Sequence, residues 1–289
     1  MTAVPGVPGR VGVLGGGRMG AGIAHAFLTA GASITVVERD GGAAAAARAR
    51  VGGALAKSVE RGTTAESRDA LEARLAVSTD YADFGGCALV VEAVPEDFAM
   101  KSAALAAVEE QLAPDAWLAT NTSSLSVTDL AAVLRRPERF CGLHFFNPVP
   151  ASALVEVVLG AGTSAELAAA ANGWVEALGK RAVVVRDAPG FASSRLGVAI
   201  ALEAIRMVEE GVAAAADIDA AMELGYKHPV GPLRTTDIVG LDVRLGIAEY
   251  LASTLGERFA PPQLLRDKVA RGELGRKSGK GFYDWTTGD

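Results

Sequence analysis

Residues 10–38 read RVGVLGGGRMGAGIAHAFLTAGASITVVE and contain the clearest structural signature of the chain. A short β-type run, 10–14, leads into a glycine-rich turn. A helical stretch follows until Gly31, and a second β-type run, 33–37, ends at Glu38. The order strand, glycine turn, helix, strand and acid predicts the first unit of a parallel α/β sheet.

The glycine turn has the chemistry of a dinucleotide site. Gly15 permits the tight turn, Gly17 lets the backbone approach a pyrophosphate, and Gly20 allows close helix–strand packing. Glu38 lies 23 residues after Gly15, where an acid binds ribose hydroxyls and repels the 2′-phosphate of NADP, although Arg39 beside it softens that preference. A turn without a ligand is the alternative. We expect a Rossmann-type domain that binds NAD through Gly15, Gly17, Arg18, Met19, Gly20 and Glu38.

Length and composition exclude several other classes of protein. The 289 residues are half hydrophobic, which suffices for two domains, and no apolar run reaches about 18 residues. The start MTAVPGVPG lacks the pattern of a secretory signal, so a cytoplasmic enzyme without a membrane partner is expected. A net charge of −6 without a basic stripe argues against nucleic-acid binding. Two cysteines and three histidines predict no metal centre, and Cys141 is expected to be a buried thiol.

Two later strand-like runs, 89–91 and 117–120, end in polar residues. Strand ends in such sheets line the cofactor crevice. Glu96, Lys101 and Asn121 are therefore candidates for contact with the nicotinamide half of NAD. For Glu96 and Lys101, a surface position at the start of a helix is the alternative.

A histidine and an acid follow on the next two strand-like runs. The run RFCGLHFF delivers His144 at its end, and LVEVV places Glu156 among aliphatic residues 12 positions later. An ionised acid in such a setting is costly unless it is paired. We expect the imidazole to transfer a proton while the carboxylate fixes its tautomer and stabilises the imidazolium. A purely structural histidine is the alternative.

The remaining segments are predicted to be helical. The stretch 41–76 is predicted to form a helical segment within the first domain. Beyond the break at Pro189, the helical runs are 191–211, 217–224, 237–255 and 262–271. This pattern predicts a Rossmann-type domain over 10–187 and an all-helical domain over 188–289.

Motifs along residues 10–285 resemble a known family. GGGRMGAGIA, VEAVPED, NTSSLSVTDLA, RPERFCGLHFFNPVP, LVEVV, APGF, VEEGVA with DIDAAM, HPVGP and GRKSGKGFYDW occur in order. Together they resemble the short-chain L-3-hydroxyacyl-CoA dehydrogenases, which include the 3-hydroxybutyryl-CoA dehydrogenases. The resemblance implies NAD-dependent interconversion of a (3S)-3-hydroxyacyl thioester and its 3-oxoacyl form. It also implies a homodimer formed through the helical domain.

The resemblance assigns roles to individual positions. His144 falls on the family's catalytic base, Glu156 on its carboxylate partner, and Ser123 on the serine that hydrogen-bonds the 3-oxygen of the substrate. The positions that fall on cofactor contacts are Glu96, Lys101, Asn147 and Lys277.

Departures from the family pattern cluster at substrate positions. Ser194 stands where the family has an asparagine, and a serine has a shorter reach and no amide pair. Where relatives carry residues for coenzyme A, this chain has Gly53 and Ala54 but keeps Lys57 and Arg61. Arg234 adds a charge after HPVGP.

These departures keep other functions open. The first is a dehydrogenase for a 3-hydroxyacyl group on an acyl carrier protein, as in polyketide extender-unit biosynthesis. The others are a sugar-acid dehydrogenase and an NAD-binding protein without catalysis.

Overall fold

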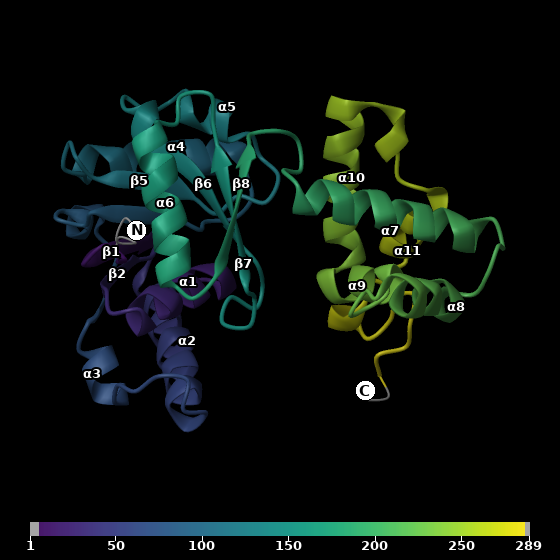
Figure 1. Cartoon of the computed structure of the whole chain (residues 1–289), viewed down its shortest axis with the longest axis horizontal. Coiled ribbons are helices and arrows are strands. Elements are labelled where there is room, and N and C mark those ends of the chain that lie inside the picture. The colour runs from purple at the N-terminus through teal and green to yellow at the C-terminus, as the bar shows by residue number, and fades with distance from the viewer. Residues whose placement is uncertain (1–5, 287–289) are drawn as a thin grey trace. The chain divides into compact units, whose positions relative to one another are not determined.

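The computed structural model describes residues 6–286 and separates into two compact units, which divide between Ala188 and Pro189. The first unit holds the strands, drawn as arrows in Figure 1, and the second is built of helices. The expected fold class, a Rossmann-type α/β domain followed by a helical domain, is confirmed.

The first unit is built on one eight-stranded sheet in the order β3-β2-β1-β4-β5-β6-β7-β8. All neighbouring strands run parallel except β6 and β7, which are antiparallel. The strands are β1 (Arg10–Leu14), β2 (Ser33–Val37), β3 (Leu75–Ser78), β4 (Leu89–Glu92), β5 (Trp117–Thr120), β6 (Phe140–Phe145), β7 (Leu154–Leu159) and β8 (Arg181–Arg186).

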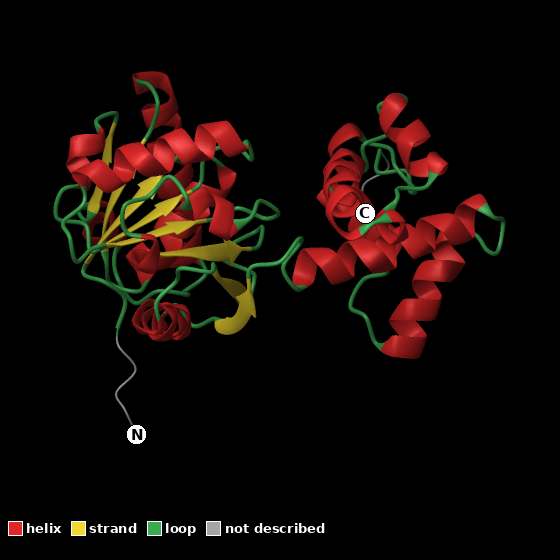
Figure 2. Cartoon of the chain, turned by 90° about the horizontal axis from the view of Figure 1, so that it is seen from above, coloured by secondary structure: helices red, strands yellow, loops and turns green. Residues whose placement is uncertain are grey.

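Helices lie on both faces of this sheet, as Figure 2 shows. They are α1 (Arg18–Thr29), α2 (Gly41–Glu60), α3 (Arg68–Glu72), α4 (Phe98–Gln111), α5 (Val127–Ala131) and α6 (Ala165–Ala177). Asp40, Asp97 and Ser164 cap α2, α4 and α6 by accepting a backbone N–H of the first turn. Buried aliphatic residues of α1, α2 and α6 pack with the sheet into one core.

Two expectations about secondary structure were wrong, and one region was not foreseen. The stretch 41–76 is not helical throughout, because a turn separates α2 from α3 and the stretch ends in β3, a four-residue strand in which only Leu75 is buried. The run 237–255 is two helices, since Gly240 interrupts it with φ +109°. Helix α6 and strand β8 were not predicted; β8 lies at the edge of the sheet and is only partly buried.

The second unit packs its helices around a separate core. Its helices are α7 (Ser193–Glu209), α8 (Ala215–Ala220), α9 (Pro232–Val239), α10 (Leu241–Leu255) and α11 (Gln263–Ala270), with a π-helical turn at Ala221–Gly225. The core contains Val198, Leu202 and Ile205 of α7 together with Leu241 and Leu251 of α10. Within residues 6–286, no helix is long and apolar enough to span a bilayer.

The last described residues are held by a buried carboxylate. Asp237 is fully buried and accepts the backbone N–H groups of Phe282 and Tyr283 and the indole N–H of Trp285, each within 2.9 Å. A Cβ at Gly281 would lie 2.2 Å from a carboxylate oxygen of Asp237. The terminal motif GKGFYDW is therefore explained by the packing of this unit.

Candidate active site

The carboxyl ends of the central strands place the glycine loop and the loop that contains Ser123 at one edge of the sheet. Leu14, Glu92 and Thr120 are register neighbours across β1, β4 and β5. The glycine loop follows β1, and the loop that contains Ser123 follows β5. In open α/β sheets this edge is where ligands bind.

The glycine loop is shaped for a close approach by phosphate groups. Gly15 has φ +89°, and a Cβ at Gly20 would lie 1.7 Å from the Gly15 carbonyl oxygen. A Cβ at Gly17 would meet nothing within 4 Å. Gly17 is also the N-cap of α1, with no side chain capping the first-turn N–H groups. The loop therefore offers open space and unsatisfied donors where a dinucleotide pyrophosphate binds.

Glu38 lies beside this loop at the end of β2. Its Oε1 accepts the N–H of Gly16 at 2.7 Å, and its Oε2 accepts the N–H of Arg39 at 3.1 Å. The half-buried carboxylate is thus fixed against the turn. These residues fit the adenosine half of NAD, with Glu38 as a ribose acceptor. Arg18 and Met19 open α1, where Arg18 is exposed and Met19 half-buried.

His144 and Glu156 are brought together by the antiparallel pair β6–β7. They are register partners, and the ring N–H at Nδ1 of His144 donates to Glu156 Oε2 at 2.8 Å. His144 is 6% exposed and Glu156 1%. A carboxylate can only accept at this position, so the neutral imidazole carries its proton on Nδ1, and Nε2 is the ring nitrogen without a proton.

Glu96 organises the loop that contains Ser123. Its Oε1 accepts from the backbone N–H of Ser123 at 2.8 Å, from the Ser123 hydroxyl at 3.1 Å and from the Thr122 hydroxyl at 2.7 Å. Although burial raises the pKa of the Glu96 carboxyl, the Lys101 ammonium and these hydrogen bonds outweigh it and leave the pKa below its ordinary value. Glu96 is therefore an ionised acceptor around which the loop folds.

The two asparagines occupy different environments. Asn121 Oδ1 accepts the N–H of Phe145 at 2.9 Å, which ties the end of β5 to the end of β6 next to His144. Asn147 is exposed and precedes Pro148 through a cis peptide bond.

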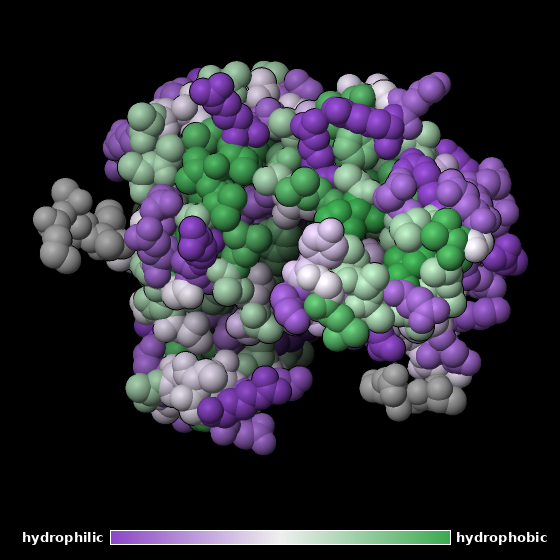
Figure 3. Space-filling view, turned by 45° about the vertical axis from the view of Figure 1, so that its right-hand side comes forward, coloured by the Kyte–Doolittle hydropathy of each residue, from purple (hydrophilic) through white to green (hydrophobic). Residues whose placement is uncertain are grey.

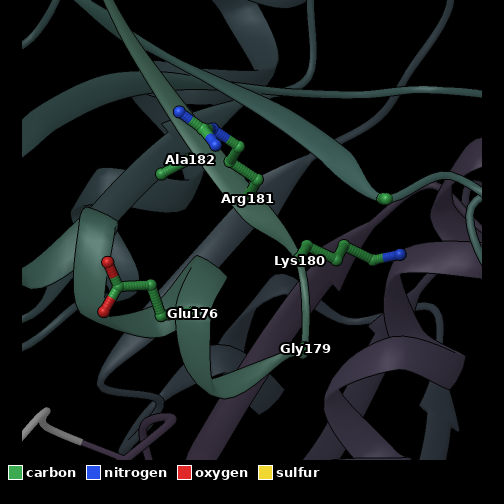
Figure 4. Close-up of a pocket in the computed structure, with 6 residues that line it drawn as sticks. Glu176, Gly179, Lys180, Arg181 and Ala182 are labelled. Atoms are coloured by element: carbon green, nitrogen blue, oxygen red, sulfur yellow. The ribbon is translucent and has the colours of Figure 1, made fainter.

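Lys180 secures the turn between β6 and β7. Its ammonium donates to the carbonyl of Val149 at 2.7 Å and to that of Ser152. Figure 4 shows this side chain extending away from Glu176 in a surface pocket, and none of the predicted site residues lines that pocket. Burial lowers the pKa of Lys180. The pocket thus lies beside the turn between β6 and β7, which Lys180 holds in place.

Four further predicted residues are exposed or carry structural contacts. Lys57 and Arg61 are exposed at the end of α2. In the second unit, the guanidinium of Arg234 stacks over Tyr283, 4.7 Å from the ring centroid. Lys277 Nζ pairs with Asp242 at 2.6 Å and remains half exposed.

Ser194 is placed at the start of the second unit. It lies in the first turn of α7 and is half-buried. This position follows Phe191, a non-glycine residue with φ +52°.

Glu92 and Thr120 were not predicted from the sequence, and they form a buried polar group with the predicted residue Lys101 behind this site. Glu92, Lys101 and Thr120 are at most 1% exposed and hydrogen-bond to one another. The available signal was an acid at the end of the aliphatic run LVVE, followed nine residues later by a lysine.

Comparison with known proteins covers both units. The family model described as "3-hydroxyacyl-CoA dehydrogenase, NAD binding domain" matches residues 10–188, and the model of the C-terminal domain of the same enzymes matches residues 190–285.

Similar proteins share the whole length. A 3-hydroxybutyryl-CoA dehydrogenase of Mycobacterium tuberculosis is 42% identical over 280 residues, which cover 96% of this chain and 98% of that protein. A probable 3-hydroxybutyryl-CoA dehydrogenase of Bacillus subtilis is 42% identical over 94% of this chain and 96% of its own length. The solved (S)-3-hydroxybutyryl-CoA dehydrogenase of Ralstonia eutropha is 36% identical with a TM-score of 0.92, covering 97% of this chain and all of that one.

Proposed function

The chain belongs to the 3-hydroxyacyl-CoA dehydrogenase family, and we propose that it interconverts (3S)-3-hydroxybutyryl-CoA and acetoacetyl-CoA with NAD. The names of its full-length relatives support this acyl group. A sugar acid as substrate and an NAD-binding protein without catalysis are less favoured, because both domains of the family are present and the His144–Glu156 pair is intact.

The observation that carries the proposal is the hydrogen bond from His144 to Glu156. It leaves Nε2 of His144 as the proton acceptor for the 3-hydroxyl group of the substrate. Glu156 then stabilises the imidazolium, because its carboxylate already accepts the Nδ1 proton. In the reverse direction the same imidazolium returns the proton to the 3-oxygen.

Ser123 orients the 3-oxygen in this scheme. Glu96 fixes the backbone of Ser123 and accepts from its hydroxyl, so the serine is held at the strand end where the cofactor crevice lies. When bound, NAD supplies the acceptor for the hydride on C3, and the protein contributes position and proton transfer. The proposed cofactor contacts include Glu96, Lys101, Asn121, Asn147 and Lys277.

Oxidation of NADH by acetoacetyl-CoA tests the proposal, with His144→Ala as the comparison. We expect turnover that prefers NADH to NADPH and falls about 10²–10⁴-fold in the variant, with NADH affinity retained. Retention of a tenth or more of the activity in the variant would remove His144 as the base.

An acyl group on a carrier protein is the second candidate substrate. The differences at Ser194 and Arg234 keep it open, because they fall on positions expected to bind the substrate, whereas the names of the relatives point to coenzyme A as the carrier. If NADH binds but acetoacetyl-CoA is not reduced, 3-oxoacyl groups on a carrier protein are the next substrates. Such a substrate would place the enzyme in polyketide extender-unit biosynthesis.

We propose a homodimer formed through the second unit. Leu196 and Ile200 lie four residues apart on α7 and are 64% and 38% exposed, and Val239 and Val243 are 41% and 43% exposed. Figure 3 shows apolar side chains gathered among polar ones on the molecular surface. Light scattering should give a dimer for the wild type and a monomer for Leu196→Glu. A cytoplasmic location remains a prediction, which cell fractionation tests.

A further inference from the structure

A buried ion pair lies behind the loop that contains Ser123. Glu92 ends β4 and is fully buried, and Lys101 of α4 is 1% exposed, with its ammonium 2.7 Å from Glu92 Oε1. Burying two charges costs free energy that only good geometry and further hydrogen bonds offset. Both oxygens of Glu92 have further partners: Oε1 accepts the N–H of Val94 at 2.6 Å, and Oε2 accepts the hydroxyl of Thr120 at 2.6 Å.

Two routes connect Glu92 to the loop. Through Lys101, whose ammonium lies 3.4 Å from Glu96 Oε2, it reaches the carboxylate that binds Ser123. Through Thr120, whose oxygen accepts the N–H of Thr122 at 3.2 Å, it reaches the start of the same loop. Glu92 Oε1 binds Lys101 and Oε2 binds Thr120, so each oxygen contacts the first residue of one route. A single carboxylate therefore orients the side chains that begin both routes.

We propose that Glu92 is a positioning residue for the loop 122–124. Its charge holds the Lys101 ammonium against Glu96, and its second oxygen aims the Thr120 hydroxyl so that the oxygen of Thr120 is free to accept from Thr122. Glu92 is fully buried and acts only through these neighbours. The inference rests on the proposed function, since the role of Ser123 in orienting substrate is proposed there.

The competing explanation is a purely structural ion pair. A structural pair contributes only to stability. Removing one partner leaves the other charge buried and unpaired, which lowers the thermal midpoint, and replacing both partners by neutral groups restores it. A positioning pair behaves differently, because a neutral pair no longer holds Glu96. The double variant therefore separates the two explanations.

The experiment compares the wild type with Glu92→Gln, Lys101→Met, the double variant and Glu109→Gln. Glu109 is a matched control, since it is a 9% exposed carboxylate that accepts the backbone N–H groups of Arg135 and Arg136, away from the loop. Three quantities are measured: hydrogen exchange of the Ser123 and Ser124 amides, the kinetics with acetoacetyl-CoA, and the NADH dissociation constant. The thermal midpoint reports stability in parallel.

The backbone N–H groups of Ser123 and Ser124 both donate to Glu96 Oε1, at 2.8 and 3.1 Å. We therefore expect Glu92→Gln to raise amide exchange at both by about 10-fold or more. Its kcat should fall about 10–10²-fold because the orienting hydroxyl is misplaced, and this fall should exceed the change in the NADH dissociation constant, to which Glu96 and Lys101 also contribute. The double variant should regain the thermal midpoint lost by the single variants but neither the protection nor kcat. The Glu109→Gln control should retain wild-type exchange in this loop.

Recovery of protection and kcat in the double variant would overturn the inference, because charge balance alone would then suffice. Unchanged exchange at Ser123 and Ser124 in Glu92→Gln would overturn it as well. If the wild type itself fails to reduce acetoacetyl-CoA, the proposed substrate is wrong. The exchange measurement still decides the role of Glu92 in that case.

Discussion

His144 and Glu156 lie directly opposite each other on the antiparallel strands β6 and β7, and the Nδ1–H of the histidine donates to the carboxylate at 2.8 Å. Directly opposed residues of an antiparallel pair lie on the same face of the sheet. The register therefore delivers the pair without any contribution from a flexible loop. A one-residue slip of β7 would move Glu156 to the other face.

The role of Glu156 predicts a large loss of activity in Glu156→Gln. The carboxamide can donate a hydrogen bond to Nδ1, which favours the tautomer that carries the proton on Nε2 and removes the base. We expect kcat to fall about 10²–10⁴-fold and the NADH dissociation constant to stay within a few-fold. Steady-state kinetics and fluorescence titration of NADH measure the two quantities.

Glu176→Gln is the control for that prediction. Glu176 lies on α6, and its carboxylate accepts only from the side chain of Asn172 among the hydrogen bonds described. Wild-type kinetics are expected for it. Equal losses in the two variants would mean that the effect at Glu156 is not specific to the pair.

The pair could be predicted from sequence because its signals are local. An acid among aliphatic residues needs a partner, and the strand that carries His144 precedes it with a turn between them. The glycine loop and Glu38 could also be predicted from the sequence, because their spacing follows from one strand–helix–strand unit. The burial of Cys141 was also predicted correctly, since that cysteine lies in the apolar run of β6 and is 0% exposed.

The network behind Ser123 could not be derived in the same way. Glu92, Lys101 and Thr120 come from three different elements, and their contact depends on how α4 packs beside β4 and β5. Strand β3 was not predicted for a related reason. It lies at the edge of the sheet, where a strand needs few apolar residues, so its sequence shows no clear alternation of apolar and polar residues. Pairings that depend on packing between elements leave little local signal.

The charge of Glu38 predicts the preference between the two nicotinamide cofactors. In Glu38→Gln, the amide oxygen can still accept from Gly16, but the repulsion of a 2′-phosphate is lost while Arg39 remains. The ratio of kcat/KM for NADH to that for NADPH should fall by about 10-fold or more. Glu60→Gln at the exposed end of α2 should leave the ratio unchanged. An unchanged ratio in Glu38→Gln would exclude Glu38 from cofactor selection.

The burial of both cysteines predicts thiols that do not react in the native protein. Burial raises the pKa of Cys141 to about 12, so only about 10⁻⁴ of it is thiolate at pH 8. Burial also raises the pKa of Cys87, against the smaller opposing effects of Arg10 and Thr35. Ellman's reagent should label neither thiol in buffer and both in concentrated guanidinium chloride. Rapid labelling of the native protein would show that the first unit opens around these cysteines.

The lowered pKa of Glu96 predicts an acid-dependent contribution to stability. Because the folded protein binds this proton less readily than the unfolded chain, the contribution is fully present above the ordinary pKa of 4.5 and is lost as the pH falls through the folded-state pKa. The difference in unfolding free energy between the wild type and Glu96→Gln should therefore be larger at pH 6 than at pH 3. Urea unfolding at the two pH values measures it. A difference that grows on acidification would contradict the assigned direction.

We predict that Ser194→Asn, which introduces the residue expected at this position from the family pattern, increases activity. An asparagine amide reaches farther than a serine hydroxyl and adds a second kind of hydrogen-bonding group, and one oriented donor at a developing oxyanion is worth on the order of 10²-fold in rate. If acetoacetyl-CoA is the natural substrate and the serine is a tolerated change, Ser194→Asn should raise kcat with it, by up to about 10-fold. Ser193→Asn, one position earlier in the first turn of α7, is the matched control and should show no gain. A fall in kcat for Ser194→Asn would instead favour a different acyl group or a carrier-bound substrate.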